Sequence, residues 1–112
     1  MEIKDTLIIA KDFSSTPGAR YVSDGSDVSA EAFLKILVPR LDKAIKENYI
    51  LRIILDGVMG FPSSFVSGSF GKLSIERTAN VLIKHIKFES DDNPIRKEQI
   101  IFEINNPKNK NA

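Results

Sequence analysis

A short, almost continuously apolar run directly follows a long amphipathic helix pattern, and this pair constrains the fold most. Residues 49–55 read Y-I-L-R-I-I-L, which is typical of a strand buried on both faces of a sheet. In residues 29–48, apolar side chains recur at intervals of three and four, which predicts a helix with one buried stripe. Ser29 is the expected N-cap, and Pro39 is expected to kink the helix. The stripe comprises Phe33, Leu37, Leu41, Ala44 and Ile45.

Further runs extend this alternation along the chain. Residues 6–13 predict a first strand, 20–23 a short hairpin strand and 81–88 a later strand. A last helix is expected over residues 95–104, after the start signal Asp92-Asn93-Pro94. Alternating strands and helices predict an α/β fold: a small sandwich in which helices pack on a mixed β-sheet.

Length and charge limit the classes of function. The chain has 112 residues, so we expect one domain over residues 1–104 and a disordered polar tail over 105–112. The net charge is +1, and Lys108 and Lys110 in the tail are the main basic bias, so we expect no nucleic-acid partner. No apolar run approaches the ~20 residues of a membrane span, so no membrane partner is expected. The absence of cysteine favours the cytoplasm.

One segment stands apart by its lack of charge. Residues 57–75 contain a single charged side chain, Lys72, although 28% of the chain is charged. The segment starts at the carboxyl end of the most apolar strand, where open α/β sheets form binding sites. We therefore expect it to contain an interaction site.

The local pattern in this segment predicts a loop and then a helix. The loop runs through Gly60 and Pro62, and the helix begins near Ser63 or Ser64. Val66, Phe70 and Leu73 would form its buried stripe. A purely structural interpretation is also open, in which the two serines cap the helix and the phenylalanines are core residues.

The strand, loop and helix over residues 55–71 resemble the signature of STAS domains, the fold of anti-sigma factor antagonists and sulfate transporter tails. That signature is similar to L-D-L-S-x-V-x-F-M-D-S-S-G-L-G-x-x-x-L-G, with a regulatory serine at the helix start. Ser63 and Ser64 fall on its paired serines and Gly71 on its late glycine. Pro62 and Phe65 stand where the signature has aspartate and glycine.

A second resemblance, over roughly residues 10–104, is to a STAS-like family of unknown function. Its members carry a Thr/Pro-Pro-Gly-x-Arg stretch, an Asp-Gly turn before a helix, and later a Ser-Phe pair followed by Phe-Gly. The corresponding segments here are 16–20 (T-P-G-A-R), 24–25 (D-G), 64–65 (S-F) and 70–71 (F-G). This resemblance points to Ser64, whereas the phospho-acceptor pattern points to Ser63, so both are candidate acceptors.

These resemblances imply a regulatory protein-interaction domain of bacterial type that is not an enzyme. The implied partner is a histidine-kinase-like ATPase of the anti-sigma class, which would phosphorylate a serine at the helix start. The expected contact residues are Phe61, Pro62, Phe65 and Ser67. Since phosphoserine adds about −1.5 to −2 charges to an uncharged surface, phosphorylation would switch the domain between bound and released states.

A small-ligand sensor is the alternative, because some STAS relatives are thought to bind nucleotides or lipids. The loop over residues 57–64 together with Arg20 would hold an anion. The structural alternative for Arg20 is that it anchors a loop or is solvated.

The sequence contains little to suggest catalysis, a metal or another cofactor. The single histidine, His85, falls in the predicted strand and is expected at the surface or on an edge strand. Asp56 is expected to bond loop amides, and the acidic residues of segment 89–92 are expected to form a solvated turn. The chain contains no G-x-S-x-G elbow, and the P-loop pattern fails around Gly71-Lys72.

Overall fold

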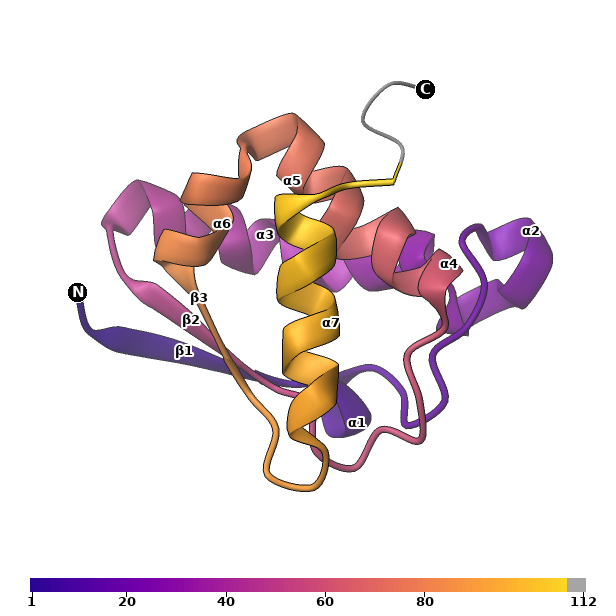
Figure 1. Ribbon diagram of the computed structural model, residues 1–112. Helices are drawn as coiled ribbons and strands as arrows, with labels where there is room; N and C mark the ends of the chain where they lie inside the picture. The colour runs from indigo at the N-terminus through magenta and orange to yellow at the C-terminus, as the bar shows by residue number, and fades with distance from the viewer. Residues whose placement is uncertain (109–112) are drawn as a thin grey trace.

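A three-stranded parallel sheet is the centre of the fold. The structure is a computed structural model that describes residues 1–108. Strands β1 (Ile3–Ile8), β2 (Ile50–Ile54) and β3 (Ile86–Glu89) pair in the order β1-β2-β3. Both pairs are parallel, with Leu7 opposite Ile53 and Ile53 opposite Phe88. In Figure 1, α3, α5 and α6 lie above this sheet and α7 runs down in front of it. The α/β class is confirmed.

The sheet is parallel throughout residues 1–108, so the expectation of a mixed sheet is wrong. The predicted hairpin strand at 20–23 is absent: helix α2 (Val22–Gly25) and the 3-10 helix η1 (Ser26–Val28) occupy this region. The backbone N–H of Val22 donates to the Glu31 carboxylate at 2.8 Å, and Glu31 N–H donates to the Arg20 carbonyl at 3.0 Å. These bonds tie the segment to the following helix rather than to the sheet.

The first strand lies earlier than the sequence pattern predicts. β1 ends at Ile8, and the next four residues form the short helix α1 (Ile9–Asp12). The Asp12 carboxylate accepts the N–H of Ile8 at 2.8 Å, and Phe13 N–H donates to the Ile9 carbonyl at 3.0 Å. These local bonds turn the chain out of the sheet where the apolar pattern alone would continue it.

Helix α3 (Ala30–Glu47) matches its prediction closely. The Ser29 hydroxyl accepts the N–H of Ala32 at 3.1 Å, and Asn48 ends the helix with φ 60°. Pro39 lies inside without breaking the helix, on its exposed side. Four of the five stripe residues are buried, and Ile45 packs against the core.

Most of the low-charge segment, residues 57–75, belongs to one helical run over residues 63–77. It consists of α4 (Ser63–Val66), a π-helical turn η2 (Ser67–Gly71) and α5 (Lys72–Arg77). All residues from 65 to 71 are buried. The predicted stripe of Val66, Phe70 and Leu73 is confirmed. The lack of charge here reflects burial in the middle of the run, and only its two ends reach the surface.

The predicted strand at 81–88 is half wrong. Residues 81–85 belong to helix α6 (Ala79–His85), and only the last part is β3. The Thr78 hydroxyl caps α6 by accepting Val81 N–H at 3.4 Å. His85 is buried at the end of α6, and its Nδ1 lies 2.9 Å from the Tyr49 carbonyl, so it is satisfied but lies neither on a strand nor at the surface.

The last helix, α7 (Pro94–Asn105), confirms the prediction for residues 95–104. The described fold continues past the expected boundary, because Lys108 N–H donates to the Glu103 carboxylate at 2.8 Å. The first residues of the predicted tail are therefore attached to α7. Residues 109–112 of that tail lie outside the described part of the chain.

Helices cover only one face of the sheet. Along β2, Leu51 and Ile53 are buried, while Arg52 and Ile54 between them are partly exposed. The same alternation occurs in β3, where Phe88 is buried and Lys87 exposed. The expectation that β2 is buried on both faces is therefore wrong. Its open face carries the Arg52–Glu89 ion pair, with 2.6 Å between nitrogen and oxygen.

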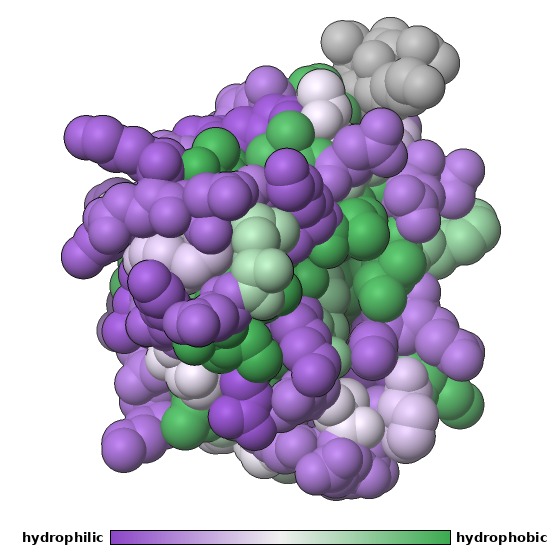
Figure 2. Space-filling view, turned by 90° about the vertical axis from the view of Figure 1, so that its left-hand side faces the viewer, coloured by the Kyte–Doolittle hydropathy of each residue, from purple (hydrophilic) through white to green (hydrophobic). Residues whose placement is uncertain are grey.

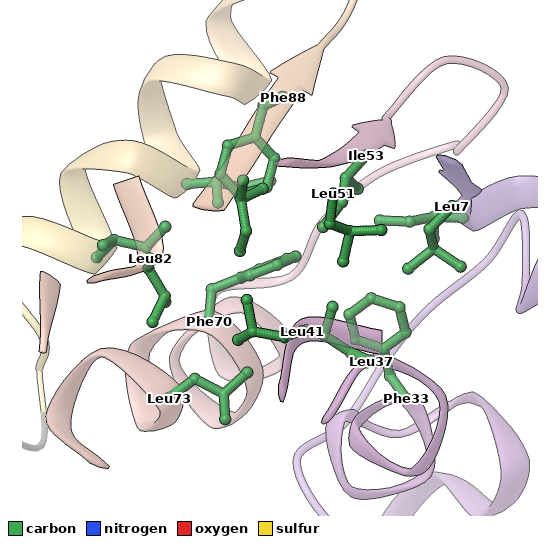
Figure 3. Packing of buried hydrophobic residues seen from close by; sticks show 14 of the residues in the cluster. Leu7, Phe33, Leu37, Leu41, Leu51, Ile53, Phe70, Leu73, Leu82 and Phe88 are labelled. Carbon is green, nitrogen blue, oxygen red and sulfur yellow. The ribbon is translucent and has the colours of Figure 1, made fainter. Parts of the chain in front are cut away.

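The core lies between this covered face and the helices. Figure 3 shows Phe70 of η2 in its middle, pointing toward the sheet between Leu82, Leu41 and Phe88. The Phe70 ring lies 5.2 Å from the Phe88 ring and 5.8 Å from the Phe33 ring, both edge-on. Phe65 extends the cluster, with its ring 5.4 Å from that of Phe33.

We predict that Phe65→Ala destabilises the protein strongly. Phe65 is fully buried, and deleting such a side chain costs about 3–5 kcal/mol through lost burial and a residual cavity. Phe102→Ala is the matched control, because that side chain is 68% exposed; its effect should stay within about 0.5 kcal/mol. Urea denaturation measures both free energies of unfolding, and equal losses would contradict the assignment of Phe65 to the core.

Candidate functional site

The loop after β2 is held by paired aspartates. The Asp56 carboxylate accepts the N–H groups of Asp91 and Asp92 at 2.7 and 2.8 Å. In return, the Asp92 carboxylate accepts Gly57 N–H at 3.1 Å. This reciprocal arrangement joins the β2 loop to the β3–α7 loop and confirms the expected role of Asp56. The Gly57 bond, followed by the bond network with Asp56, lowers the pKa of Asp92.

Arg96 of α7 fixes the next part of the loop. Its guanidinium donates to the Val58 carbonyl and to the Met59 carbonyl, the latter at 3.0 Å. It also lies over the Phe61 ring, 5.9 Å from the centroid. Arg96, which the sequence pattern did not predict as a site residue, holds Phe61 in position beside α7.

The helix start differs from the expectation that serines cap it. Pro62 occupies the N-cap position, and Ser63 is the first helical residue. Neither Ser63 nor Ser64 makes a side-chain capping bond, and within residues 1–108 neither hydroxyl has a hydrogen-bond partner. Ser63 is exposed and Ser64 is half-buried. The candidate acceptors are therefore not used for capping, and Ser63 is the more accessible one.

An apolar groove lies between α4 and α7, with a volume of about 470 Å³. Its most exposed apolar side chains are Phe102, at 68%, and Ile95, at 61%. Ser63 lies among the residues that line it. The full lining is Phe61, Ser63, Val66, Ile95, Glu98, Gln99, Phe102, Glu103, Asn106 and Lys108. Figure 2 shows a different face of the molecule, in which apolar patches alternate with hydrophilic side chains.

Two of the four expected contact residues reach the surface, and the other two are buried in the core. Phe61 is half-buried and Pro62 exposed, so both reach the surface near the groove. Phe65 is fully buried in the aromatic cluster, and Ser67 is 3% exposed. In this structure, Phe65 and Ser67 pack inside the domain instead of presenting a contact surface.

Arg20 does not join the 57–64 loop, as the anion hypothesis supposed. Its Nη2 donates to the Ser67 hydroxyl at 2.6 Å, farther along the helical run. A cavity of about 200 Å³ opens beside this pair. The loop and Arg20 therefore belong to two separate places in the fold.

The residues of α7 that face the groove were also missed. Ile95 and Phe102 are seven positions apart, which places them on one face of a helix, whereas Ile100 and Ile104 form the buried face. The sequence did contain a signal for them, because Ile95 and Phe102 are apolar residues on a second face of an otherwise amphipathic helix. Within residues 1–108, no group of three or more acidic, histidine or cysteine side chains is arranged to hold a metal ion. No helix in that range is long and apolar enough to cross a membrane.

Together, the parallel sheet, its one-sided helical layer and the serine-containing helix start after β2 define a small α/β domain of STAS-like type. Residues 29–96 match the family described as STAS-like domain of unknown function (DUF4325). The match covers more than half of the chain, so the protein belongs to this family, and the resemblance to it is confirmed. Searches of curated proteins and of solved structures found no match.

We predict that Asp92→Asn lowers stability at neutral pH but not in acid. The folded-state pKa of Asp92 lies below the ordinary aspartate value of 3.8, so the ionised carboxylate stabilises the fold above that pH. The contribution is lost as pH falls through the lowered folded-state pKa. The melting temperature of the variant should therefore lie below that of the wild type at pH 7, and the difference should close as the pH falls through the lowered folded-state pKa of Asp92.

Asp91→Asn is the control, because the exposed Asp91 side chain makes no hydrogen bond within residues 1–108. It should melt like the wild type across the same pH range. A difference for Asp92→Asn that persists unchanged in acid would contradict the electrostatic explanation.

Proposed function

We propose that this protein is a non-enzymatic regulatory domain whose α4–α7 groove docks an apolar segment of a histidine-kinase-like ATPase. The observation that supports this most is the groove itself, which exposes Phe102 and Ile95 beside the unengaged hydroxyl of Ser63. A soluble domain rarely leaves two large apolar side chains this exposed in one concave site unless a partner covers them. The lack of cysteine suits a reducing compartment, and we place the activity in the cytoplasm.

Ser63 is the proposed phosphorylation site. It is exposed, lines the groove and makes no hydrogen bond within the described residues, so a kinase can reach it without opening the fold. Ser64 is half-buried, and the Ser67 hydroxyl points back toward its carbonyl at 3.4 Å. Ser64 is therefore the weaker candidate.

Phosphate at Ser63 would oppose docking. Glu98 and Glu103 line the groove against a single cation, Lys108, so a phosphate adds about −1.5 to −2 charges to a lining that is already negative on balance. A partner that covers the groove must remove water from that charge without supplying a counter-charge, because the segment it inserts is apolar. Phosphorylation then releases the partner, and dephosphorylation restores docking.

Phosphorylation is tested by incubating the purified protein with its candidate ATPase and Mg-ATP, followed by peptide mass spectrometry. We expect one phosphate, on Ser63, and its loss in Ser63→Ala. Ser64→Ala is the control, and it should still be phosphorylated. Modification of Ser64 alone, or none with any histidine-kinase-like ATPase from the same genome, would refute the switch.

Docking is tested by titrating that ATPase with groove variants in a calorimeter. Ile95→Ser and Phe102→Ser should each weaken binding by at least ten-fold, since truncating a central contact costs more than about 1.4 kcal/mol. Ile83→Ser is the matched control, because Ile83 is 44% exposed on α6, outside the groove. If all three variants bind equally well, the ATPase does not use this groove.

A further inference from the structure

A second concave site lies near the other end of the helical run. The cavity of about 200 Å³ is bounded by the loop at Arg20, the start of α3 and the π-helical turn. Its lining residues are Arg20, Tyr21, Glu31, Leu34, Ser67, Gly68, Lys72 and Ile75. None of them lines the α4–α7 groove, so this site is independent of the proposed docking function.

Arg20 differs from the other arginines of the chain in its hydrogen bonds. Arg40, Arg52 and Arg77 each lie within 4.0 Å of a carboxylate oxygen, and Arg96 donates to two backbone carbonyls. Among the residues whose side chains the structure describes, 1–23 and 27–108, the Arg20 guanidinium bonds only the Ser67 hydroxyl. Since a guanidinium has five N–H donors, most of those on Arg20 remain free to bind a ligand at the cavity.

The fold specifically accommodates Arg20 at this position. Ala19 adopts a left-handed conformation with φ 64°, which is uncommon for a residue with a side chain. Gly68 leaves room for the arginine, because a Cβ there would lie 2.9 Å from Arg20 Cγ. The contact falls on a π-helical turn, a feature that is frequent at functional sites. Three unusual backbone features thus converge on one side chain.

The other lining residues define the chemistry of a ligand. Lys72 adds a second cation, is exposed, and forms no ion pair within the described residues. Glu31 is the one carboxylate in the lining, and it already accepts Val22 N–H at 2.8 Å. The cavity therefore keeps a positive balance. Leu34, Ile75 and the 53% exposed Tyr21 supply an apolar wall.

We infer that this cavity binds a small organic anion, through Arg20 and Lys72, with its apolar part against Leu34 and Ile75. Arginine presents a planar pair of donors that matches two oxygens of a carboxylate or a phosphate. The volume of about 200 Å³ lies below the roughly 300–1,000 Å³ of sites for drug-sized ligands. It therefore suits an anionic group with a small ring or a short chain.

The test uses phenyl phosphate, benzoate and inorganic phosphate as probes in ¹H–¹⁵N NMR titrations of the full chain. We expect saturable shifts of the Ser67 and Gly68 amides with phenyl phosphate or benzoate, and the tighter of the two identifies the anionic group. Inorganic phosphate should bind more weakly than phenyl phosphate, because it cannot use the apolar wall. No saturable shift at these amides with any probe would overturn the inference.

Two substitutions locate the binding determinants. Arg20→Lys keeps the charge but loses the paired donors, and it should weaken binding by at least ten-fold. Lys72→Gln should weaken it about two- to five-fold, as expected for an exposed cation. Lys97→Gln, on the exposed surface of α7, is the control and should leave binding unchanged.

The Lys72→Gln result remains decisive if Arg20→Lys fails to fold, because Lys72 is exposed and forms no ion pair with the side chains that the structure describes, those of residues 1–23 and 27–108. Equal losses in Lys72→Gln and Lys97→Gln would mean general charge attraction and would refute a specific site. Neither outcome depends on an ATPase, so this inference can fail or succeed independently of the docking proposal.

Discussion

The burial of residues 65–71 on every side is the constraint on which the rest of this structure depends. A helix enclosed in this way cannot carry charge, because an unpaired ion taken out of water costs several kcal/mol. Phe70 faces the sheet, and its ring packs edge-on against those of Phe33 and Phe88. On its other sides the helical run packs closely against α3 and α7. Such close packing requires small side chains at the contact positions of the run.

Two glycines make these close approaches possible. At Gly68, a Cβ would lie 3.1 Å from the Ala30 Cβ of α3, beside Arg20. At Gly71, it would lie 2.8 Å from a Glu103 carboxylate oxygen of α7. Serines with internal bonds complete the set: the Ser69 hydroxyl donates to the Phe65 carbonyl at 2.7 Å, and the Ser74 hydroxyl to the Ile104 carbonyl. With residues 65–71 enclosed, the helical run reaches the surface only on either side of them, at Ser63 and from Lys72 onward.

The sequence correctly predicts the helices whose apolar residues repeat regularly and whose ends carry recognisable capping residues. Helix α3 has a 3.6-residue stripe and a serine N-cap, and α7 has an Asn-Pro start, so both are found almost to the residue. Residues 81–88 read V-L-I-K-H-I-K-F, which fits alternation, yet Leu82 and His85 also share one helix face. The pattern of residues 81–85 is therefore compatible with both a strand and a helix, and the helix forms because Thr78 caps it and it packs against the core.

The candidate sites were harder to predict for two physical reasons. Low charge is common to buried helices and to interaction surfaces, so the uncharged segment over residues 57–75 suggested more exposed surface than the fold provides. The Arg20–Ser67 bond joins residues 47 positions apart, and no local pattern encodes such a contact. What the pattern did locate is the helix start at Ser63, because serines after a buried strand and a proline mark a helix boundary.

The π-helical turn has a consequence for comparing this chain with its relatives. A π-helical bulge contains one residue more than the α-helix it interrupts, and each α-helical residue turns the helix by about 100°. The wider π-turn rotates each of its residues by less than that, so the extra residue is absorbed locally, and a relative one residue shorter between Ser67 and Gly71 would have a uniform α-helix whose two ends keep their relative orientation. Such a gap in an alignment would indicate loss of the bulge that lies beside Arg20, and not a shortened loop.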